Sequence, residues 1–357
     1  MLFERTEEQE MLMDTLTRFV LDGVKPHATA WSQAGAMPVD ALEGLRDLGL
    51  LGLELPEAVG GAGFGPVEWV QSVESLAAGD GGLALALVVH SVAASVLSRD
   101  ASGHEELLQG LAAGEIYGTV AWVDQRKNPL QVESDGEHLV LNGGKDAVAI
   151  GQQAAWVLVR ANRDGEEGLA LVGCDAPGVS FEPVSNGLGL RSAALCTLKC
   201  EDVRIESKAW LGADALVVAQ VQLDLGIAAL AVGLGAACLQ EGARYGMDRK
   251  QFGQPIAMFQ ANQFKLADMV TENDGARLMV LRAALSKNLR EVDMARVFAT
   301  ESAFKAADHA LQLHGGYGFT EEFPVERFYR DTQFTTALFR TGDMLRSEIA
   351  TQLLKEV

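Results

Sequence analysis

The segment ALQLHGGYGFTEEFPVERFYRD, Ala310 to Asp331, changes from a helical pattern of apolar residues to a glycine-rich turn. Gly315 and Gly316 carry no side chain, so the backbone there can come close to a phosphate or a ribose. The amide of Gln312 can hydrogen-bond to the same group. The two glycines also fit a plain turn that ends a helix. Taken alone, the segment therefore indicates either a nucleotide contact or a helix end.

A second segment with binding potential is YGMDRKQFGQPIAMFQANQFKLADM, Tyr245 to Met269. Arg249 can offer a bidentate hydrogen-bonding fork to a pyrophosphate, and Gln251 and Phe252 are the neighbours that would approach it. A surface ion pair is the alternative role for Arg249.

The rest of the chain divides into three parts by its periodicity. Residues 1–116 have a helical pattern broken by prolines and a Gly-rich loop. Residues 117–212 contain short apolar or alternating runs separated by Asn-Gly, Asp-Gly and Pro-Gly, which is typical of antiparallel hairpins in a small barrel or sandwich. Residues 213–357 return to the helical period. The sequence therefore predicts an α+β fold, with a β-domain between an N-terminal helical domain and a C-terminal helical bundle.

Individual helices can also be placed. Thr6 is a plausible N-cap, with Gln9 three residues later closing a capping box. In the C-terminal part we expect one helix after Asp331 and three long ones, at Val217 to Lys250, Gln260 to Lys287 and Asp293 to His314.

Composition limits the partners. The 357 residues carry a formal charge of −20, which disfavours nucleic-acid binding. A small anionic ligand is compatible with that charge, because a local basic pocket overrides the global field. The longest apolar stretch, Leu225 to Leu239, has 15 residues and is short for a membrane span, so we expect a buried core helix.

The compartment is indicated by the N-terminus and the cysteines. The N-terminus has no signal-peptide pattern, and four cysteines in a chain of this length indicate a reducing compartment. We therefore expect a cytoplasmic protein. Cys196 and Cys200 lie on one face of a predicted strand, without a second pair or a nearby histidine, which argues against a metal site.

Four segments in order resemble the recurrent motifs of the acyl-CoA dehydrogenase family. They are the two C-terminal segments above and two earlier ones, GLLGLELPEAVGGAGFG (Gly49 to Gly65) and LGLRSAALCTLKCEDVRI (Leu188 to Ile205). The resemblance covers nearly the whole chain. It implies a C-terminal four-helix bundle, assembly as dimers or dimers of dimers, FAD as cofactor and an acyl-CoA thioester as substrate. It also implies an electron-transfer flavoprotein-like acceptor and a role in lipid metabolism, such as fatty acid or steroid degradation.

The resemblance also assigns roles to residues. The positions that it implies contact the ADP half of an FAD held mainly by the neighbouring subunit are Arg249, Gln251, Phe252, Gln312, Gly315 and Gly316. Thr341 and Asp343 match positions that touch FAD from the subunit's own side. The family reaction passes an α proton to a carboxylate base and a β hydride to the flavin.

The catalytic carboxylate is missing from both positions where the family has it. Phe339 and Arg340 stand where the family motif Tyr-Glu-Gly-Thr has Glu and Gly. The alternative base position is Gly226, and the next residue, Ile227, stands where the family often has Arg. Phenylalanine and glycine cannot accept a proton, so we expect no catalytic residue in this chain at the family positions.

The segments that surround the flavin ring in the family differ as well. AWVDQRKNPLQVE (Ala121 to Glu133) is shorter than its family counterpart, and the family's hydroxyls are absent both from this segment and from GKDAVAIG (Gly144 to Gly151). Ala193, Ala194 and Leu195 stand where the family tends to have Ser and Thr. Such a pocket leaves the polar edges of a flavin without partners.

Three hypotheses follow. The chain is the degenerate partner in a heteromer, for example a heterotetramer with a second acyl-CoA dehydrogenase subunit, and contributes its cofactor contacts across the interface. Alternatively, it is a self-sufficient homo-oligomeric flavoenzyme whose base is relocated to Asp124, Glu321 or Glu322, or whose reaction needs none. Finally, it is a non-catalytic binding or scaffold protein with a dehydrogenase fold.

Overall fold

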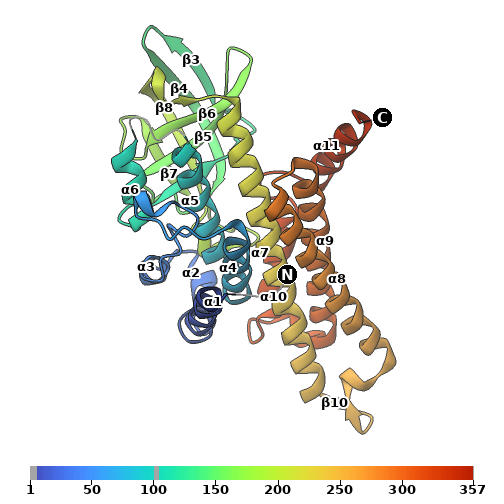
Figure 1. Cartoon of the computed structure of the whole chain (residues 1–357). Coiled ribbons are helices and arrows are strands. Elements are labelled where there is room, and N and C mark those ends of the chain that lie inside the picture. The colour runs from blue at the N-terminus through green and yellow to red at the C-terminus, as the bar shows by residue number, and fades with distance from the viewer. Residues whose placement is uncertain (1–5, 100–103, 357) are drawn as a thin grey trace.

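The structure is a computed structural model that describes residues 6–99 and 104–356. Helices come first along the chain, strands follow, and long helices complete it, which confirms the predicted α+β fold. In Figure 1 the sheet lies beside the N-terminal helices, and the C-terminal helices extend away from both as an elongated bundle.

The described residues of the N-terminal part, 6–99 and 104–116, form six α-helices. They are α1 (Glu7–Phe19), α2 (Ala28–Ala34), α3 (Val39–Asp47), α4 (Pro66–Gly79), α5 (Gly81–Arg99) and α6 (Glu105–Ala113). The capping box predicted at the start of α1 is present: Thr6 and Gln9 each accept a hydrogen bond from the other's backbone N–H. Pro66 occupies the first turn of α4, where no backbone N–H is needed.

The central part is one nine-stranded sheet with its own buried apolar cluster. Its longer strands are β3 (Gln131–Asp135), β4 (His138–Val148), β5 (Trp156–Arg163), β6 (Glu166–Gly173), β7 (Val179–Pro183) and β8 (Cys196–Glu206). Short strands β1 (Gly118–Ala121), β2 (Val123–Asp124) and β9 (Trp210–Leu211) complete it. Most pairs are antiparallel as predicted, but β1 pairs with β5 in parallel, because the chain returns to β5 after the β2–β4 segment instead of through a hairpin.

The C-terminal part is built on α7 (Ala213–Asp248), α8 (Gln260–Ser286) and α9 (Leu289–His314). The two-stranded turn of β10 (Lys250–Gln251) and β11 (Gln254–Pro255) joins α7 to α8, and α10 (Val325–Thr335) and α11 (Gly342–Leu354) follow α9. Figure 1 shows α7 running from the sheet to the far end of the bundle, where β10 lies. The domain boundaries at 116/117 and 212/213 stay a prediction about folding units.

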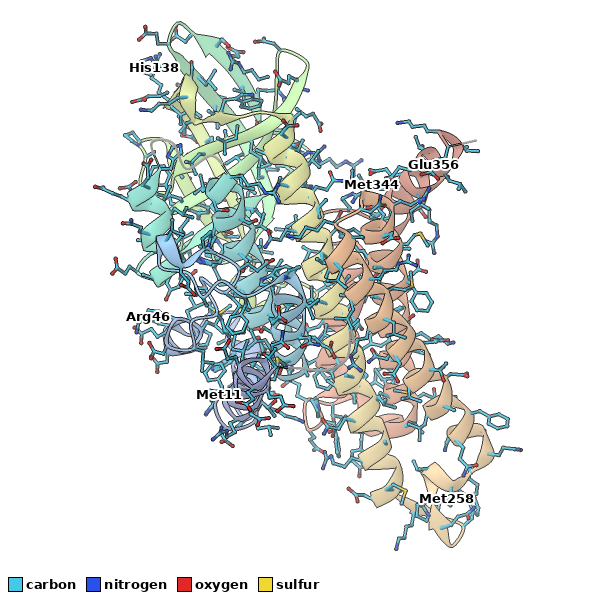
Figure 2. All side chains as sticks on the ribbon, viewed as in Figure 1. Met11, Arg46, His138, Met258, Met344 and Glu356 are labelled. Carbon is cyan, nitrogen blue, oxygen red and sulfur yellow. The ribbon has the colours of Figure 1, made fainter. Side chains whose placement is uncertain are left out.

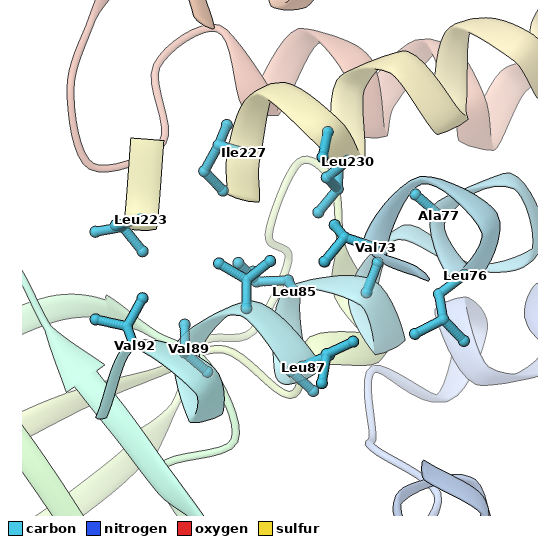
Figure 3. Close-up of a cluster of buried hydrophobic side chains, with 14 of the residues drawn as sticks. Val73, Leu76, Ala77, Leu85, Leu87, Val89, Val92, Leu223, Ile227 and Leu230 are labelled. Atoms are coloured by element: carbon cyan, nitrogen blue, oxygen red, sulfur yellow. The ribbon is translucent and has the colours of Figure 1, made fainter. Parts of the chain in front are cut away.

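The main core lies where α4, α5 and α7 meet. Figure 3 shows leucines and valines of the three helices facing one another, among them Leu85, Val73 and Leu230. Both α5 and α7 are long and apolar enough to cross a membrane. However, 89% and 67% of their apolar windows are buried inside the protein, as expected of core helices. Gly233 allows the close crossing of α7 and α4, since a Cβ there would lie 2.1 Å from the Glu74 carbonyl oxygen.

Candidate cofactor and catalytic sites

A pocket of about 490 Å³ opens at the far end of the C-terminal bundle. Four of the predicted binding residues line it together: Arg249, Gln251, Gly315 and Gly316. Arg249 caps the end of α7, Gln251 lies in β10, and the turn after α9 carries the glycines. Segments that are more than 60 residues apart in the sequence thus meet in one pocket.

Two features of this pocket bear on the predicted phosphate contact. The Arg249 side chain is exposed and makes no ion pair with any described residue of this chain, so its guanidinium is open to a ligand or to another subunit. Gly315 adopts φ +60°, and added Cβ atoms at Gly315 and Gly316 would meet nothing within 4 Å. Gly315 caps the end of α9, and its backbone conformation by itself favours glycine, whereas neither packing nor backbone conformation requires one at Gly316. The space beside both glycines is open to a ligand.

Aromatic rings form one wall of this pocket. His314 stacks on Tyr245 with 4.0 Å between ring centroids, and Phe323 lies edge-on to both. His314 Nδ1 lies 2.8 Å from the carbonyl oxygen of Ala310, which fixes the proton on Nδ1, while the buried Nε2 has no hydrogen-bond partner among the described residues. Burial lowers the pKa of His314, so the ring is neutral and apolar in character at neutral pH.

The remaining predicted cofactor residues lie elsewhere. Gln312 is exposed and Phe252 is 94% exposed, and neither lines the pocket. Thr341 caps the start of α11, where its hydroxyl accepts the N–H of Met344, and Asp343 is in the first turn of that helix. Figure 1 shows α11 and β10 at opposite ends of the bundle, so one chain does not bring the two groups of residues together.

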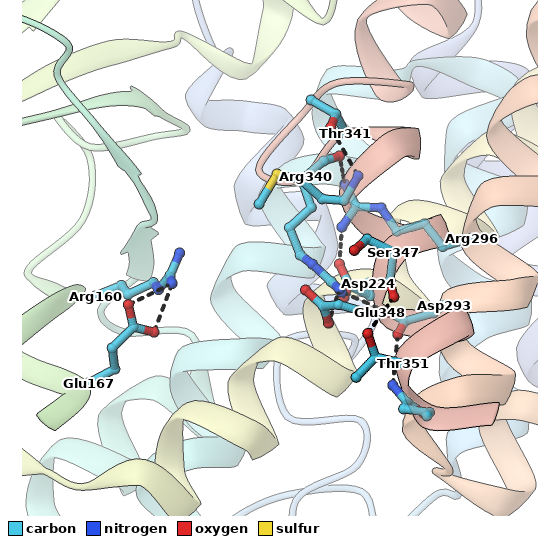
Figure 4. Close-up of polar contacts among 12 residues, drawn as sticks. Arg160, Glu167, Asp224, Asp293, Arg296, Arg340, Thr341, Ser347, Glu348 and Thr351 are labelled. Atoms are coloured by element: carbon cyan, nitrogen blue, oxygen red, sulfur yellow. Dashed lines mark hydrogen bonds and ion pairs between the residues drawn. The ribbon is translucent and has the colours of Figure 1, made fainter. Parts of the chain in front are cut away.

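The segment at the family's base position is buried against a cluster of charges. Phe339 is 6% exposed with φ +64°, and no carboxylate takes its place. Beside it, Arg340 turns inward and forms ion pairs with Asp224, Asp293 and Glu348. Arg340 Nη1 lies 2.8 Å from Asp293 Oδ1, and Nη2 lies 2.6 Å from Glu348 Oε2. Figure 4 shows these side chains converging from α7, α9 and α11.

Arg296 of α9 completes the cluster. It is fully buried, pairs with Asp224, and donates hydrogen bonds to the carbonyl oxygens of Leu338 and Arg340. Burial, with the charge of Arg340, lowers the pKa of Arg296 to about 9. Burial also raises the pKa of Asp293, although Arg340 opposes that effect. Arg296 holds the backbone carbonyls of Leu338 and Arg340, and the Arg340 side chain is held by carboxylates of α7, α9 and α11. The cluster therefore fixes the segment at the base position.

The alternative base position is closed by packing. A Cβ at Gly226 would lie 2.6 Å from Val88 Cγ1 and 3.0 Å from the Trp69 ring. Ile227 is fully buried in the same core (Figure 3). No carboxylate side chain fits at Gly226 unless α5 or Trp69 moves.

The segments expected around a flavin ring bond to each other. The Ile150 N–H donates to the Ala193 carbonyl oxygen at 2.9 Å, and both residues are fully buried. The Ala149 carbonyl accepts the Thr119 hydroxyl at 2.6 Å. These backbone groups are therefore hydrogen-bonded within the protein. The Thr119 hydroxyl is used in one of these bonds, and Ala149, Ile150 and Ala193 have no hydroxyl to offer a flavin ring.

The carboxylates considered as relocated bases are engaged or exposed. Asp124 is half-exposed and pairs with the buried amine of Lys145 at 2.7 Å. Glu321 accepts a hydrogen bond from Gln33 at 2.8 Å, and both Glu321 and Glu322 are exposed on the link between α9 and α10. None of the three is buried beside a site for a substrate.

Sequence reasoning missed the charge cluster. The sequence shows Phe339 and Arg340 only as residues that replace the Glu and Gly of the family motif. The structure adds that Arg340 has three carboxylate partners. A signal was available, because Arg296 and Asp293 stand among the apolar positions of a helix pattern, where charges are rarely buried without a partner.

Comparisons with known proteins agree with this architecture. Residues 6–115 match the model for the N-terminal domain of acyl-CoA dehydrogenases, and residues 221–354 match that for their C-terminal domain. Similar proteins include the probable acyl-CoA dehydrogenase YngJ of Bacillus subtilis, 36% identical over 99% of this chain and 100% of that protein. Another is the mitochondrial isobutyryl-CoA dehydrogenase of Dictyostelium discoideum, 29% identical over 98% of this chain and 90% of that protein.

A similar solved structure is that of a glutaryl-coenzyme A dehydrogenase in its glutaryl-CoA complex. It superposes with a TM-score of 0.93 at 26% identity, over 99% of this chain and 96% of that one.

Proposed function

Because this chain belongs to the acyl-CoA dehydrogenase family, we propose that it is a subunit that lacks its own catalytic base and shares FAD with a competent partner subunit. The reaction of the complex is the α,β-desaturation of an acyl-CoA thioester, with electrons passed on to an electron-transfer flavoprotein-like acceptor. When bound, FAD supplies the acceptor for the hydride that leaves the β carbon.

The cofactor contacts of this chain belong to the pocket at the end of the bundle. Arg249, Gly315 and Gly316 would hold the pyrophosphate side of an FAD, because the guanidinium is exposed without an ion-pair partner among the described residues and the space beside the glycines is open. Gln251 lines the same pocket. Gln312, Phe252, Thr341 and Asp343 are proposed contacts that depend on assembly with a second subunit.

The observation that carries the proposal is the burial of Arg340. At the place where the family has its Glu-Gly pair, this chain has Phe339 and an arginine that is 3% exposed and paired with three carboxylates. A catalytic base at this position would be a carboxylate that faces the space for a substrate. Here the segment instead forms ion pairs with Asp224 of α7 and Asp293 of α9. The occupied space at Gly226 supports the same conclusion for the second position.

An exposed apolar surface supports assembly with another subunit. The large apolar side chains exposed on the C-terminal helices include Phe264, Leu278, Leu285, Phe298, Met344, Leu353 and Leu354. Figure 2 shows two exposed methionines, Met258 and Met344, near the two ends of the bundle. A surface of this kind on a soluble chain marks an interface. We place the complex in the cytoplasm, since all four cysteines are free thiols.

The test is the absorption spectrum of the purified chain, alone and co-expressed with the product of a neighbouring gene. We expect flavin absorbance only in the co-expressed complex. Anaerobic bleaching of that flavin by short, long and polycyclic acyl-CoA thioesters identifies the substrate. The Phe339→Glu variant should add no activity to the complex.

Two outcomes contradict the proposal. If the unpartnered chain is yellow and is bleached by a thioester, it is a self-sufficient enzyme. If neither preparation contains flavin, the chain is a non-catalytic member with the same fold.

A further inference from the structure

A second cavity, of about 160 Å³, lies beside the first half of α7 and is lined there by Val218, Val221, Gln222 and Leu225. It is enclosed by the starts of α4 and α7, the end of α5 and Lys287, the residue that caps α8. None of the residues that line the pocket at the end of the bundle takes part in it. Its contents are therefore independent of the proposed cofactor contacts.

The inner end of this cavity presents hydrogen-bond acceptors. Glu54 Oε2 accepts the side-chain N–H of Gln222 at 2.8 Å, and Gln222 is 9% exposed. Among the described residues, no donor reaches Glu54 Oε1, Gln222 Oε1 or the Ser95 hydroxyl. A carboxylate, an amide oxygen and a hydroxyl can together receive three hydrogen bonds from a ligand.

The charge of Glu54 is not compensated inside the cavity. Burial raises the pKa of Glu54, and nearby Glu68 raises it further, whereas Lys287 lowers it only in part. The Lys287 side chain is exposed at the mouth of the cavity. It forms no ion pair with Glu54 among the described residues. A cationic donor bound beside Glu54 would remove the cost of burying this carboxylate.

The mouth and the walls have different chemistry. Two cationic side chains, Lys287 and Arg99, are exposed at the mouth and favour an anionic group there. The ring of Trp69 and the side chain of Leu225, both at most 2% exposed, provide an apolar wall. The cavity is thus acidic inside, basic outside and apolar along one side.

We propose that this cavity binds a small zwitterionic aliphatic amino acid. Its ammonium group donates three hydrogen bonds to Glu54, Gln222 and Ser95, its carboxylate faces Lys287 and Arg99, and its alkyl group packs on Trp69. The volume suits such a ligand, because a cavity of about 150 Å³ admits benzene, which has about as many non-hydrogen atoms as alanine.

The experiment is isothermal titration calorimetry of the full chain with L-alanine and L-2-aminobutyrate. Butyrate and n-propylamine serve as probes that carry only one of the two charges. We expect both amino acids to bind and the two single-charge probes to bind at least about tenfold more weakly, since each lacks one charge-assisted set of hydrogen bonds. Equal binding of butyrate, or no binding by either amino acid, overturns the proposal.

Two variants separate a specific site from weak binding elsewhere. Glu54→Gln keeps the side-chain shape but removes the charge, and should weaken amino-acid binding by about tenfold or more. Lys287→Met acts on an exposed residue and should weaken amino-acid binding too. Lys127→Met, exposed in the link between β2 and β3, is the matched control and should change nothing. Unchanged affinity in both cavity variants rejects the site, whatever the result of the flavin experiment.

Discussion

Replacing Arg340 with methionine tests whether the charge cluster fixes the segment at the family's base position. The substitution keeps an unbranched side chain of similar length but removes the guanidinium. Asp293 then keeps only the amide of Gln352, at 3.3 Å, and Asp224 keeps only Arg296. Glu348, with its side chain 45% exposed, can turn to solvent, so the cost falls mainly on the two buried aspartates.

The magnitude follows from the burial of these groups. Asp224 and Asp293 are each 1% exposed, and removing one partner of a buried ion pair typically costs about 3–5 kcal/mol. Part of that cost is relieved at low pH. Burial already raises the pKa of Asp293 above its unfolded value, and loss of Arg340 raises it further, so the folded variant takes up a proton before the unfolded chain does. The deficit of the variant should therefore shrink as the pH falls toward the unfolded pKa.

The assay is urea unfolding followed by circular dichroism at two pH values. Arg346→Met is the matched control, because Arg346 pairs with Glu301 on the surface, with side chains 54% and 47% exposed, where a pair is worth about 0–1 kcal/mol. The double variant Arg340→Met, Asp293→Asn should recover part of the loss, since it removes the unpaired carboxylate. If Arg340→Met unfolds at the same urea concentration as the control, the charge cluster does not hold this segment.

Three further predictions use other parts of the chain. Gly226→Glu should destabilise the protein and create no dehydrogenase activity, because its Cβ would meet Val88 at 2.6 Å; a stable, active variant in urea and bleaching assays contradicts this. Arg249→Ala should weaken FAD binding in the assembled complex by about 1.5–3 kcal/mol, measured as flavin content, and unchanged content removes the assignment. Burial lowers the pKa of His90 to about 4, so stability should fall by about 3 kcal/mol as the pH drops from 6.5 to 4. His90→Gln should flatten that slope in pH-dependent unfolding, and His138→Gln, on an exposed residue, should not.

Local patterns were enough to predict the elements and the family. The capping box of Thr6 and Gln9 and the long helices of the bundle depend on residues within a few turns of each other, so their periods and caps can be recognised in short windows. The glycine-rich turn and the Arg249 segment are predicted as binding motifs from local patterns in the same way, and the structure places Arg249, Gln251, Gly315 and Gly316 around one pocket. Their contact with a cofactor stays a prediction. Gln312 and Phe252 belong to the same motifs but point elsewhere in a single chain.

The sequence by itself thus determined the order of helices and strands, the family, and the absence of a carboxylate at positions 226 and 339. Only the tertiary structure decided what fills those positions. Asp224 and Arg340 are 116 residues apart, and their contact depends on how α7, α9 and the segment before α11 pack against one another. The parallel pairing of β1 with β5 and the cavity beside Glu54 have the same origin. Contacts between distant segments leave no periodic trace in the sequence, because the partner of each buried charge is chosen by packing in three dimensions.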